Sequence, residues 1–171
     1  RMAAELGADW QSKFASFDRQ AVSAASLGQV HKATSHDGKR LAVKLQYPDM
    51  ASAIDADLAQ LKLVFQLYER FDSAISTADI HKELSDRLRE ELDYRREAAN
   101  LKLYSLMLKD EHQVVMPEYY SDLSSERALT MSWIEGQKLM AWLETEPSQE
   151  SRNQVAINLS LIHISEPTRQ E

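Results

Sequence analysis

The sequence predicts an α+β fold in which a small antiparallel sheet packs against two long helices. Two segments of alternating side chains, 29–34 and 41–47, flank a turn at 35–40 that contains an Asp-Gly dipeptide, which favours a tight β-hairpin. Apolar residues then recur at helical spacing through 51–71. A second, more polar helix is expected over 78–108.

Shorter elements are expected around this frame. Weak alternation at 14–18 predicts a first strand, and 128–133 predicts a later one. Thr77 is a candidate cap for the second long helix, because its hydroxyl can accept backbone N–H bonds. A short helix is expected at 138–143. The apolar stripe of the first long helix comprises Ile54, Leu58, Leu61, Phe65 and Tyr68.

The composition excludes several kinds of protein. The net charge of −7, from 20 basic and 27 acidic residues, argues against a nucleic-acid surface, because such surfaces neutralise phosphates with Lys and Arg. No apolar run approaches the roughly 18–20 residues that cross a bilayer. The absence of cysteine excludes disulfides and thiolate zinc sites. The 5 histidines are scattered, so no metal site is predicted.

A run of small residues lies just before the predicted hairpin. Ser-Ala-Ala-Ser at 23–26 lets backbone approach a ligand or another element closely, and Gly28 permits dihedral angles that residues with a Cβ avoid. Side chains alternate along 41–47, so Lys44 and Gln46 point away from the main apolar face. The run is therefore a candidate binding loop, with a lysine on the strand opposite it.

This order of features is typical of nucleotide sites in protein kinases. There, a small-residue loop between two strands covers the phosphates, and a lysine on the third strand neutralises them. Leu-Ala-Val-Lys at 41–44 is close to the kinase pattern Val-Ala-Ile-Lys. Taken alone, Lys44 is better explained as a strand lysine that faces solvent, so a partner for its charge is needed.

The second long helix offers such a partner. On one continuous helix, Asp93, Glu97 and Asn100 would share a face. Like charges at this spacing cost an isolated helix roughly 0.2–0.5 kcal/mol, which favours a cation opposite them, and Lys44 is that cation. The alternative is a solvated acidic face that pairs with the nearby arginines, namely Arg87, Arg89, Arg95 and Arg96.

Three segments together resemble the UbiB/AarF (ADCK) family of atypical kinases. They are Ala-Ala-Ser-Leu-Gly-Gln-Val-His at 24–31, Ala-Val-Lys-Leu-Gln-Tyr-Pro at 42–48 and Glu-Leu-Asp-Tyr-Arg-Arg-Glu-Ala-Ala-Asn at 91–100. The family is similar to protein kinases in fold, has an alanine-rich loop in place of the glycine-rich one, and supports coenzyme Q metabolism. Ser23 departs from the usual alanine, and Ala21 from a frequent proline.

The resemblance implies roles for individual residues. Lys44 would neutralise phosphates and pair with Glu97, the counterpart of the helix-C glutamate of kinases. Glu91 and Asp93 match the family's Glu-x-Asp motif, which engages an upstream Lys-x-Gly-Gln motif that these residues lack. The residues implied to bind the nucleotide are Ala24, Ala25, Ser26, Gly28, Lys44, Met131 and Ile134.

The same resemblance implies a partial protein. ATP or ADP is the implied cofactor, and magnesium is expected only in a full-length parent, because segments like His-x-Asp-Pro-His-Pro-Gly-Asn and Asp-Phe-Gly do not occur here. No catalytic residue is therefore assigned, and we expect the fragment alone to be inactive. The expected parts are a kinase-like N-lobe that starts mid-chain at 1–136, and the hinge with the start of a C-lobe helix at 137–158.

Residues 159–171 resemble the conceptual translation of a sequencing-library adapter, and not the next helix of the family. We expect this tail to be non-native, so His163 and Glu166 are not taken as catalytic.

Two functions remain open at this point. The first is the nucleotide-binding lobe of a UbiB-like kinase or ATPase linked to ubiquinone biosynthesis. Its partners would be a nucleotide and lipid or quinone-pathway molecules, and the parent would lie in the bacterial cytoplasm or peripherally at the inner membrane. The second is a non-catalytic module that keeps the lobe architecture and binds a protein or lipid.

Overall fold

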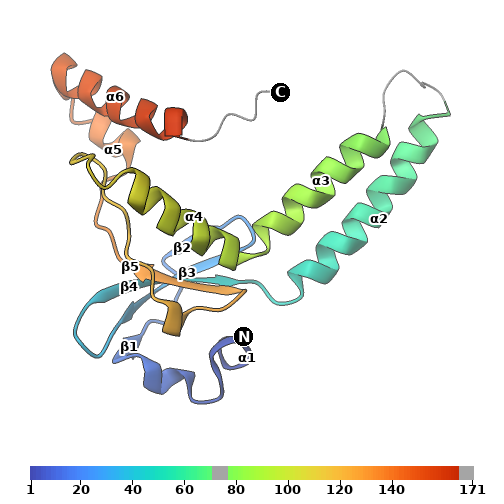
Figure 1. The fold of residues 1–171 in the computed structure, drawn as a ribbon, viewed down its shortest axis with the longest axis horizontal. Helices are drawn as coiled ribbons and strands as arrows, with labels where there is room; N and C mark the ends of the chain where they lie inside the picture. The colour runs from blue at the N-terminus through green and yellow to red at the C-terminus, as the bar shows by residue number, and fades with distance from the viewer. Residues whose placement is uncertain (71–76, 166–171) are drawn as a thin grey trace.

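A computed structural model describes residues 1–70 and 77–165, with 161–165 described by backbone alone. Its centre is a sheet of 5 strands that lies between two helical layers. The first helix, α1 (Met2–Leu6), and the 3₁₀ turn η1 (Trp10–Lys13) cover one face. The other face carries α4 (Tyr94–Met107), as Figure 1 shows. The predicted α+β architecture is confirmed.

All strand pairs in the sheet are antiparallel. The order is β1-β3-β4-β5. The short β1 pairs with the end of β3, and β2 pairs with its beginning. The turn between β3 and β4 is the predicted hairpin, and Gly38 has the positive φ of 81° that such a turn favours. The strands are β1 (Ser16–Phe17), β2 (Ser23–Ala25), β3 (Gly28–Thr34), β4 (Arg40–Gln46) and β5 (Ala128–Ser132).

Strand β4 separates the main core from the site. Leu41, Val43 and Leu45 point into the core beneath the sheet, where Leu41 and Val43 are fully buried. Lys44 and Gln46 point to the face that α4 covers, as alternation along the strand predicts. The core also contains Met2, Leu6, Phe14, Ala33 and Ala128.

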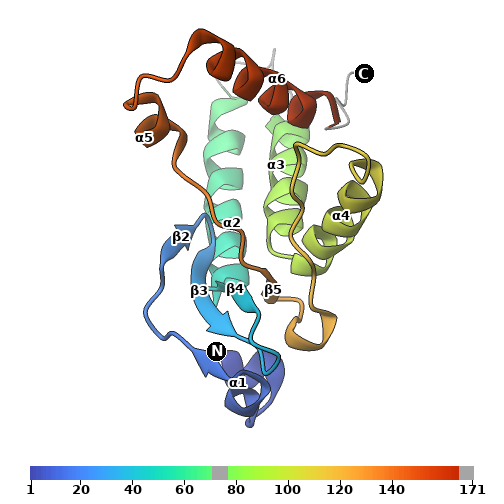
Figure 2. The same cartoon turned by 90° about the vertical axis from the view of Figure 1, so that its left-hand side faces the viewer.

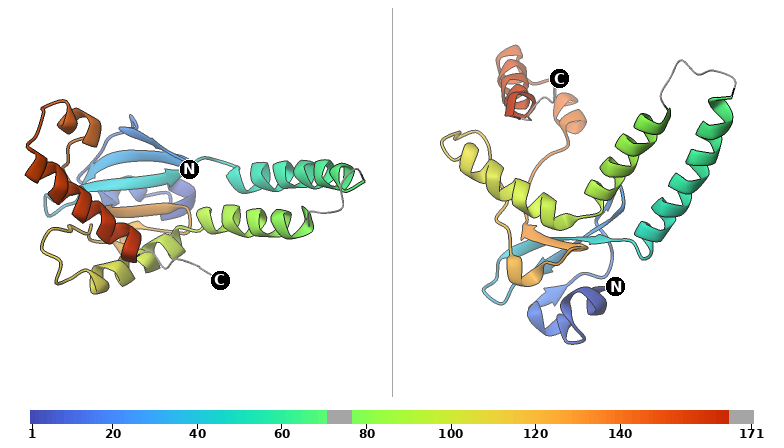
Figure 3. Two further views of the ribbon diagram at one scale, coloured as in Figure 1. Left: turned by 90° about the horizontal axis from the view of Figure 1, so that it is seen from above. Right: turned by 45° about the vertical axis from the view of Figure 1, so that its right-hand side comes forward.

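Helices α2 (Met50–Tyr68) and α3 (Thr77–Glu91) run side by side as an arm that projects from the sheet, as Figures 2 and 3 show. His81 joins them: its Nε2 lies 2.9 Å from the carbonyl oxygen of Leu58, and its ring meets Phe65 edge to face. Ile54 and Leu58 are buried, whereas Tyr68 is 44% exposed. The predicted apolar stripe is thus buried only in the half of α2 nearer the sheet.

The single helix expected over 78–108 is wrong. The chain leaves helical geometry at Asp93, whose φ of −102° and ψ of 95° separate α3 from α4. The Asp93 carboxylate accepts the backbone N–H of Arg95 at 2.9 Å and so caps α4. Two further hydrogen bonds hold the break, from Gln46 Nε2 to the Leu92 carbonyl at 2.9 Å and from the Tyr94 N–H to the Glu126 carbonyl at 2.9 Å.

Thr77 does not cap α3 as expected. It is the first residue of the helix, and its hydroxyl donates to the Glu69 carboxylate at the end of α2. This bond ties the two helices of the arm together near their far ends.

After β5 the chain forms α5 (Leu139–Leu143), close to the expected 138–143, and then α6 (Gln149–Ser165). Between α4 and β5 lies the 3₁₀ turn η2 (Ser121–Leu123), and Tyr119 forms an isolated bridge with Met131. Residues 159–165 continue α6, and 166–171 lie outside the described residues, so the non-native tail stays a prediction. Within the described chain, no helix is long and apolar enough to cross a membrane.

Candidate functional site

Lys44 and Glu97 meet across the interface between β4 and α4. Lys44 Nζ lies 2.6 Å from Glu97 Oε2, so the structure brings the two residues together as an ion pair. The Lys44 side chain is 20% exposed and that of Glu97 is 43% exposed. Water therefore screens the carboxylate, so the pair contributes little to the stability of the fold.

Tyr94 forms the floor beneath the lysine. Lys44 Nζ lies 4.6 Å from the centroid of the Tyr94 ring, within the range of a cation–π contact. Tyr94 is only 2% exposed and packs with Ala98 and Leu129. Burial, with the negative charges of Glu97 and Glu91 as smaller causes, raises the pKa of the Tyr94 phenol to about 12. The phenol is therefore neutral at physiological pH.

The small residues form the hairpin between β2 and β3. Ala24 pairs with Gln29 and Ala25 with Gly28, so Ser26 and Leu27 make the tip. Ala24 and Ser26 are exposed, and Ala25 is half-buried. The Leu27 carbonyl accepts the N–H of Tyr47 at 3.1 Å, which ties the tip to the end of β4. The hairpin is thus held at the end of the strand that carries Lys44.

Gly28 is required for a reason other than the expected one. Its φ is not positive, so unusual dihedral angles do not explain it. A Cβ at this position would collide with the carbonyl oxygen of Leu45 and lie 3.0 Å from its carbonyl carbon. Gly28 therefore lets β3 approach the backbone of β4 closely, next to the tip of the hairpin.

A hollow of about 300 Å³ opens beside the ion pair. Its lining joins β4 to the α3–α4 break and is rich in charge. Three predicted site residues, Lys44, Glu97 and Glu91, contribute to it. The full lining is Lys44, Glu90, Glu91, Arg96, Glu97 and Asn100.

The comparisons with known proteins agree on one family. Residues 1–170 match the ABC1 atypical kinase-like domain. The chain belongs to this family. The predicted resemblance to UbiB/AarF atypical kinases is thereby confirmed.

Two relatives of this ABC1-family chain are named atypical kinases. It is 33% identical over 165 residues to the mitochondrial atypical kinase COQ8 of Saccharomyces cerevisiae, covering 96% of this chain and 32% of that protein. It is 37% identical over 139 residues to the mitochondrial atypical kinase coq-8 of Caenorhabditis elegans, covering 81% of this chain and 18% of that protein. The chain thus spans a third or less of the length of these relatives.

The fold also matches a solved structure. The chain aligns with Rv3197 from Mycobacterium tuberculosis, solved as a complex with erythromycin, with a TM-score of 0.76 and 32% sequence identity. The alignment covers 90% of this chain and 39% of Rv3197.

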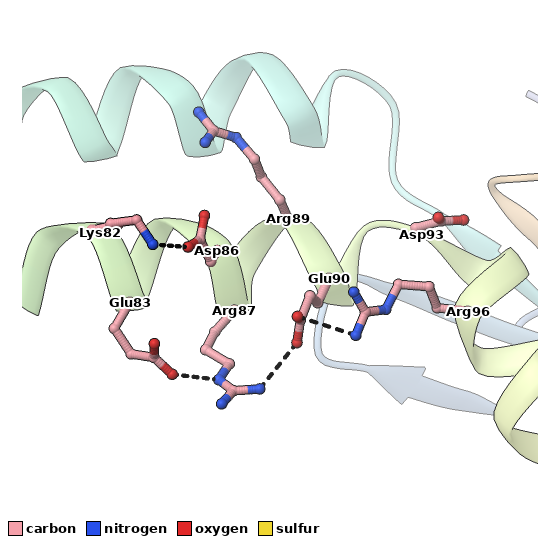
Figure 4. A pocket seen from close by; sticks show the side chains of 8 residues that line it. All are labelled: Lys82, Glu83, Asp86, Arg87, Arg89, Glu90, Asp93 and Arg96. Carbon is pink, nitrogen blue, oxygen red and sulfur yellow. Dashed lines mark hydrogen bonds and ion pairs between the residues drawn. The ribbon is translucent and has the colours of Figure 1, made fainter.

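Asp93 of this ABC1 domain does not line the hollow at Lys44. It lines a second, larger hollow of about 560 Å³ along α3, drawn in Figure 4. Because the helix breaks at Asp93, the expectation that Asp93, Glu97 and Asn100 share one face is wrong: only Glu97 and Asn100 line the hollow at Lys44. Glu91 and Asp93, the Glu-x-Asp pair, therefore line different hollows.

A chain of ion pairs crosses the helix break in Figure 4. Arg87 of α3 contacts Glu83 at 2.8 Å and Glu90 at 3.1 Å, and Arg96 of α4 contacts Glu90 at 3.1 Å. Arg89 reaches across to Asp55 of α2 at 3.4 Å. The arginines thus pair in these contacts with acids other than Glu91 and Asp93, in contrast to the solvated-face alternative.

Met131 and Ile134, also predicted to bind the nucleotide, lie in different environments. Met131 is half-buried and packs against the cluster of Tyr94, Ala98 and Leu129. Ile134 lies beyond the end of β5 and is 43% exposed. Trp133 between them is partly buried, with Lys32 Nζ 4.6 Å from the centroid of its ring.

Sequence reasoning missed three residues around Lys44. Val30 is the cross-strand partner of Lys44 on the same face, and the predicted hairpin register could have placed it there. Tyr94 stands one helical turn before Glu97, a spacing that puts both on one face. Gln46 is 2% exposed and holds the helix break, and its place on the lysine side of β4 was the only signal.

Among the side chains that the structure describes, those of 1–70 and 77–160, no group of three or more His, Cys, Asp or Glu has the arrangement to hold a metal ion.

Proposed function

We propose that this chain is the nucleotide-binding lobe of an ABC1-family atypical kinase or ATPase linked to ubiquinone biosynthesis. The observation that carries the proposal is the ammonium of Lys44, held by Glu97 and the Tyr94 ring near a hairpin of small residues. A positioned cation near exposed backbone suits the phosphates of ATP or ADP. The relatives named atypical kinases support the assignment.

Each part of the chain would have a distinct task. Lys44 would neutralise phosphate charge, and Glu97 would keep its side chain directed toward the site. The small hairpin residues, Ala24, Ala25, Ser26 and Gly28, would let the phosphates approach the backbone. Met131 and Ile134 would lie along the adenine base of the nucleotide. Glu91 and Asp93 would serve as the Glu-x-Asp motif.

The residues present fit a nucleotide better than they fit its magnesium ion. The lysine and the small hairpin offer a cation and backbone donors, whereas two of the three acids that line the hollow are already engaged, Glu97 with Lys44 and Glu90 with two arginines. Magnesium, where the reaction needs it, would be held by residues of a longer protein and would neutralise phosphate charge there.

The experiment is nucleotide binding by the longest native protein that contains these residues, measured by calorimetry with ATP and magnesium. We expect Lys44→Met to weaken binding at least about tenfold, because hydrogen bonds to charged groups contribute roughly 1.5–3 kcal/mol. Lys62→Met, at an exposed lysine of α2, is the matched control and should bind like the wild type.

The alternative, a non-catalytic interaction module, predicts a different result. In that case the wild type and Lys44→Met would show the same nucleotide titration, or none. Equal titrations would therefore refute the nucleotide-binding proposal.

A further inference from the structure

We propose that Tyr94 is a positioning residue for Lys44, and that the face of its aromatic ring, not its hydroxyl, performs this role. The inference rests on the proposed function, since it concerns the lysine assigned to the phosphates. It adds a second determinant to the Lys44–Glu97 pair.

The backbone fixes Tyr94 before its side chain makes any contact. It is the first residue of α4, directly after the capping residue Asp93. Its N–H donates to the Glu126 carbonyl at 2.9 Å, which ties this end of α4 to the segment before β5. The first turn of α4 therefore has a defined position relative to the sheet, and Tyr94 and Glu97 project from it on one side.

The ring is better placed than the carboxylate to hold the ammonium. Glu97 is 43% exposed, so its carboxylate can exchange the lysine for water at low cost. Tyr94 is 2% exposed and packed against Ala98 and Leu129, so its ring cannot turn away. The Lys44 side chain is itself only 20% exposed, and partial removal from water strengthens a cation–π contact.

The hydroxyl does not account for the tyrosine. Among the described residues, the buried Tyr94 hydroxyl has no hydrogen-bond partner. A buried hydroxyl without a partner costs stability, so it contributes nothing to holding Lys44. The ring face, with Lys44 Nζ 4.6 Å from its centroid, is the part that contacts the lysine.

The test measures the accessibility of Lys44 directly. Trace acetylation of the full chain without nucleotide, followed by mass spectrometry, gives the labelling rate of each lysine, with the exposed Lys62 as internal reference. We expect Tyr94→Phe to keep the wild-type rate at Lys44. Tyr94→Met, which retains apolar volume without a ring, should raise the Lys44 rate about threefold or more and leave Lys62 unchanged.

A second comparison removes packing as an explanation and serves if Tyr94→Met fails to fold. Replacing Tyr94 by 3,4,5-trifluorophenylalanine keeps a ring of nearly the same shape but depletes its negative face. We expect a Lys44 rate above that of Tyr94→Phe. Equal rates for the fluorinated and unfluorinated rings would overturn the inference.

Nucleotide affinity is then measured on the same proteins. Weaker affinity with the fluorinated ring than with Tyr94→Phe supports the inference in its functional form. If the labelling rates differ as expected while the wild type binds no nucleotide, the positioning role stands and the proposed function fails. The two failures are thus distinguishable.

Discussion

At the scale of single residues, Tyr94 makes a prediction about pH. Its pKa in the folded protein is raised to about 12, mainly by burial, above the ordinary value of 10.0. Below pH 10 the phenol is protonated in both states, so the full stability is present. Between pH 10 and 12 the unfolded state loses its proton first, and folding loses on the order of 2–3 kcal/mol.

The measurement is urea unfolding of the wild type and Tyr94→Phe from pH 9 to pH 12. The other groups that titrate in this range are common to both proteins and cancel in the difference. We expect the wild type to lose stability relative to Tyr94→Phe as the pH rises. A difference that stays constant with pH would contradict the raised pKa of Tyr94.

Part of the site could be predicted from the sequence at this scale. Lys44 and Glu97 could be paired in advance because each stands in a recognisable motif and their opposite charges need one another. Tyr94 could not be placed, because an aromatic residue near a helix start is ordinary core material until the helix is known to begin there. Gly28 was singled out correctly as special, but its physical reason depends on how closely β4 approaches it.

At the scale of elements, the local sequence pattern predicts the strands but not the break between α3 and α4. Alternation and the Asp-Gly turn are local signals, and they gave β3, β4 and their hairpin nearly to the residue. The break at Asp93 depends on two bonds from distant segments, from Gln46 to Leu92 and from Tyr94 to Glu126. The spacing of apolar residues within 78–108 gives no sign of either bond, and so it favoured one long helix.

The break also makes a prediction. Gln46→Met removes the donor to the Leu92 carbonyl, and an unsatisfied buried acceptor costs about 1–3 kcal/mol. The loss should appear as a lower urea midpoint, with Gln60→Met on the exposed side of α2 as the matched control. Because Gln46 fixes the start of α4, the variant should also label faster at Lys44. A wild-type midpoint together with a wild-type labelling rate would rule out this role.

At the scale of the whole molecule, burial is concentrated at the sheet. Leu41, Val43 and Ala128 are fully buried there, and the site lies on the opposite face of the same strands. The arm of α2 and α3, drawn side by side in Figure 2, has few buried apolar residues, chiefly Ile54 and Leu58. Regions with little buried apolar surface open at lower free energy, so the arm should be the least stable part of the lobe.

Two leucines on α2 test this difference. Leu58 is 5% exposed and Leu63 is 67% exposed, so one chemical change at each site separates burial from helix propensity. We expect Leu58→Ala to cost about 2–5 kcal/mol and Leu63→Ala less than about 0.5 kcal/mol. Amide hydrogen exchange in the wild type should be faster over 59–68 than over β4, and Leu58→Ala should accelerate exchange in the arm roughly 30-fold or more.

The pattern of exchange decides between two descriptions of the lobe. If the arm opens separately, its amides exchange at a lower free energy than those of Val43 and its neighbours in β4, because the sheet stays closed while the arm unfolds. If the arm and the sheet form one cooperative unit, both regions exchange at the same free energy in every variant. The break at Asp93 separates α3 from α4, and the bonds to Gln46 and Glu126 hold the start of α4. Separate opening of the arm would therefore leave Lys44 and Glu97 paired, and the site would tolerate motion of the arm.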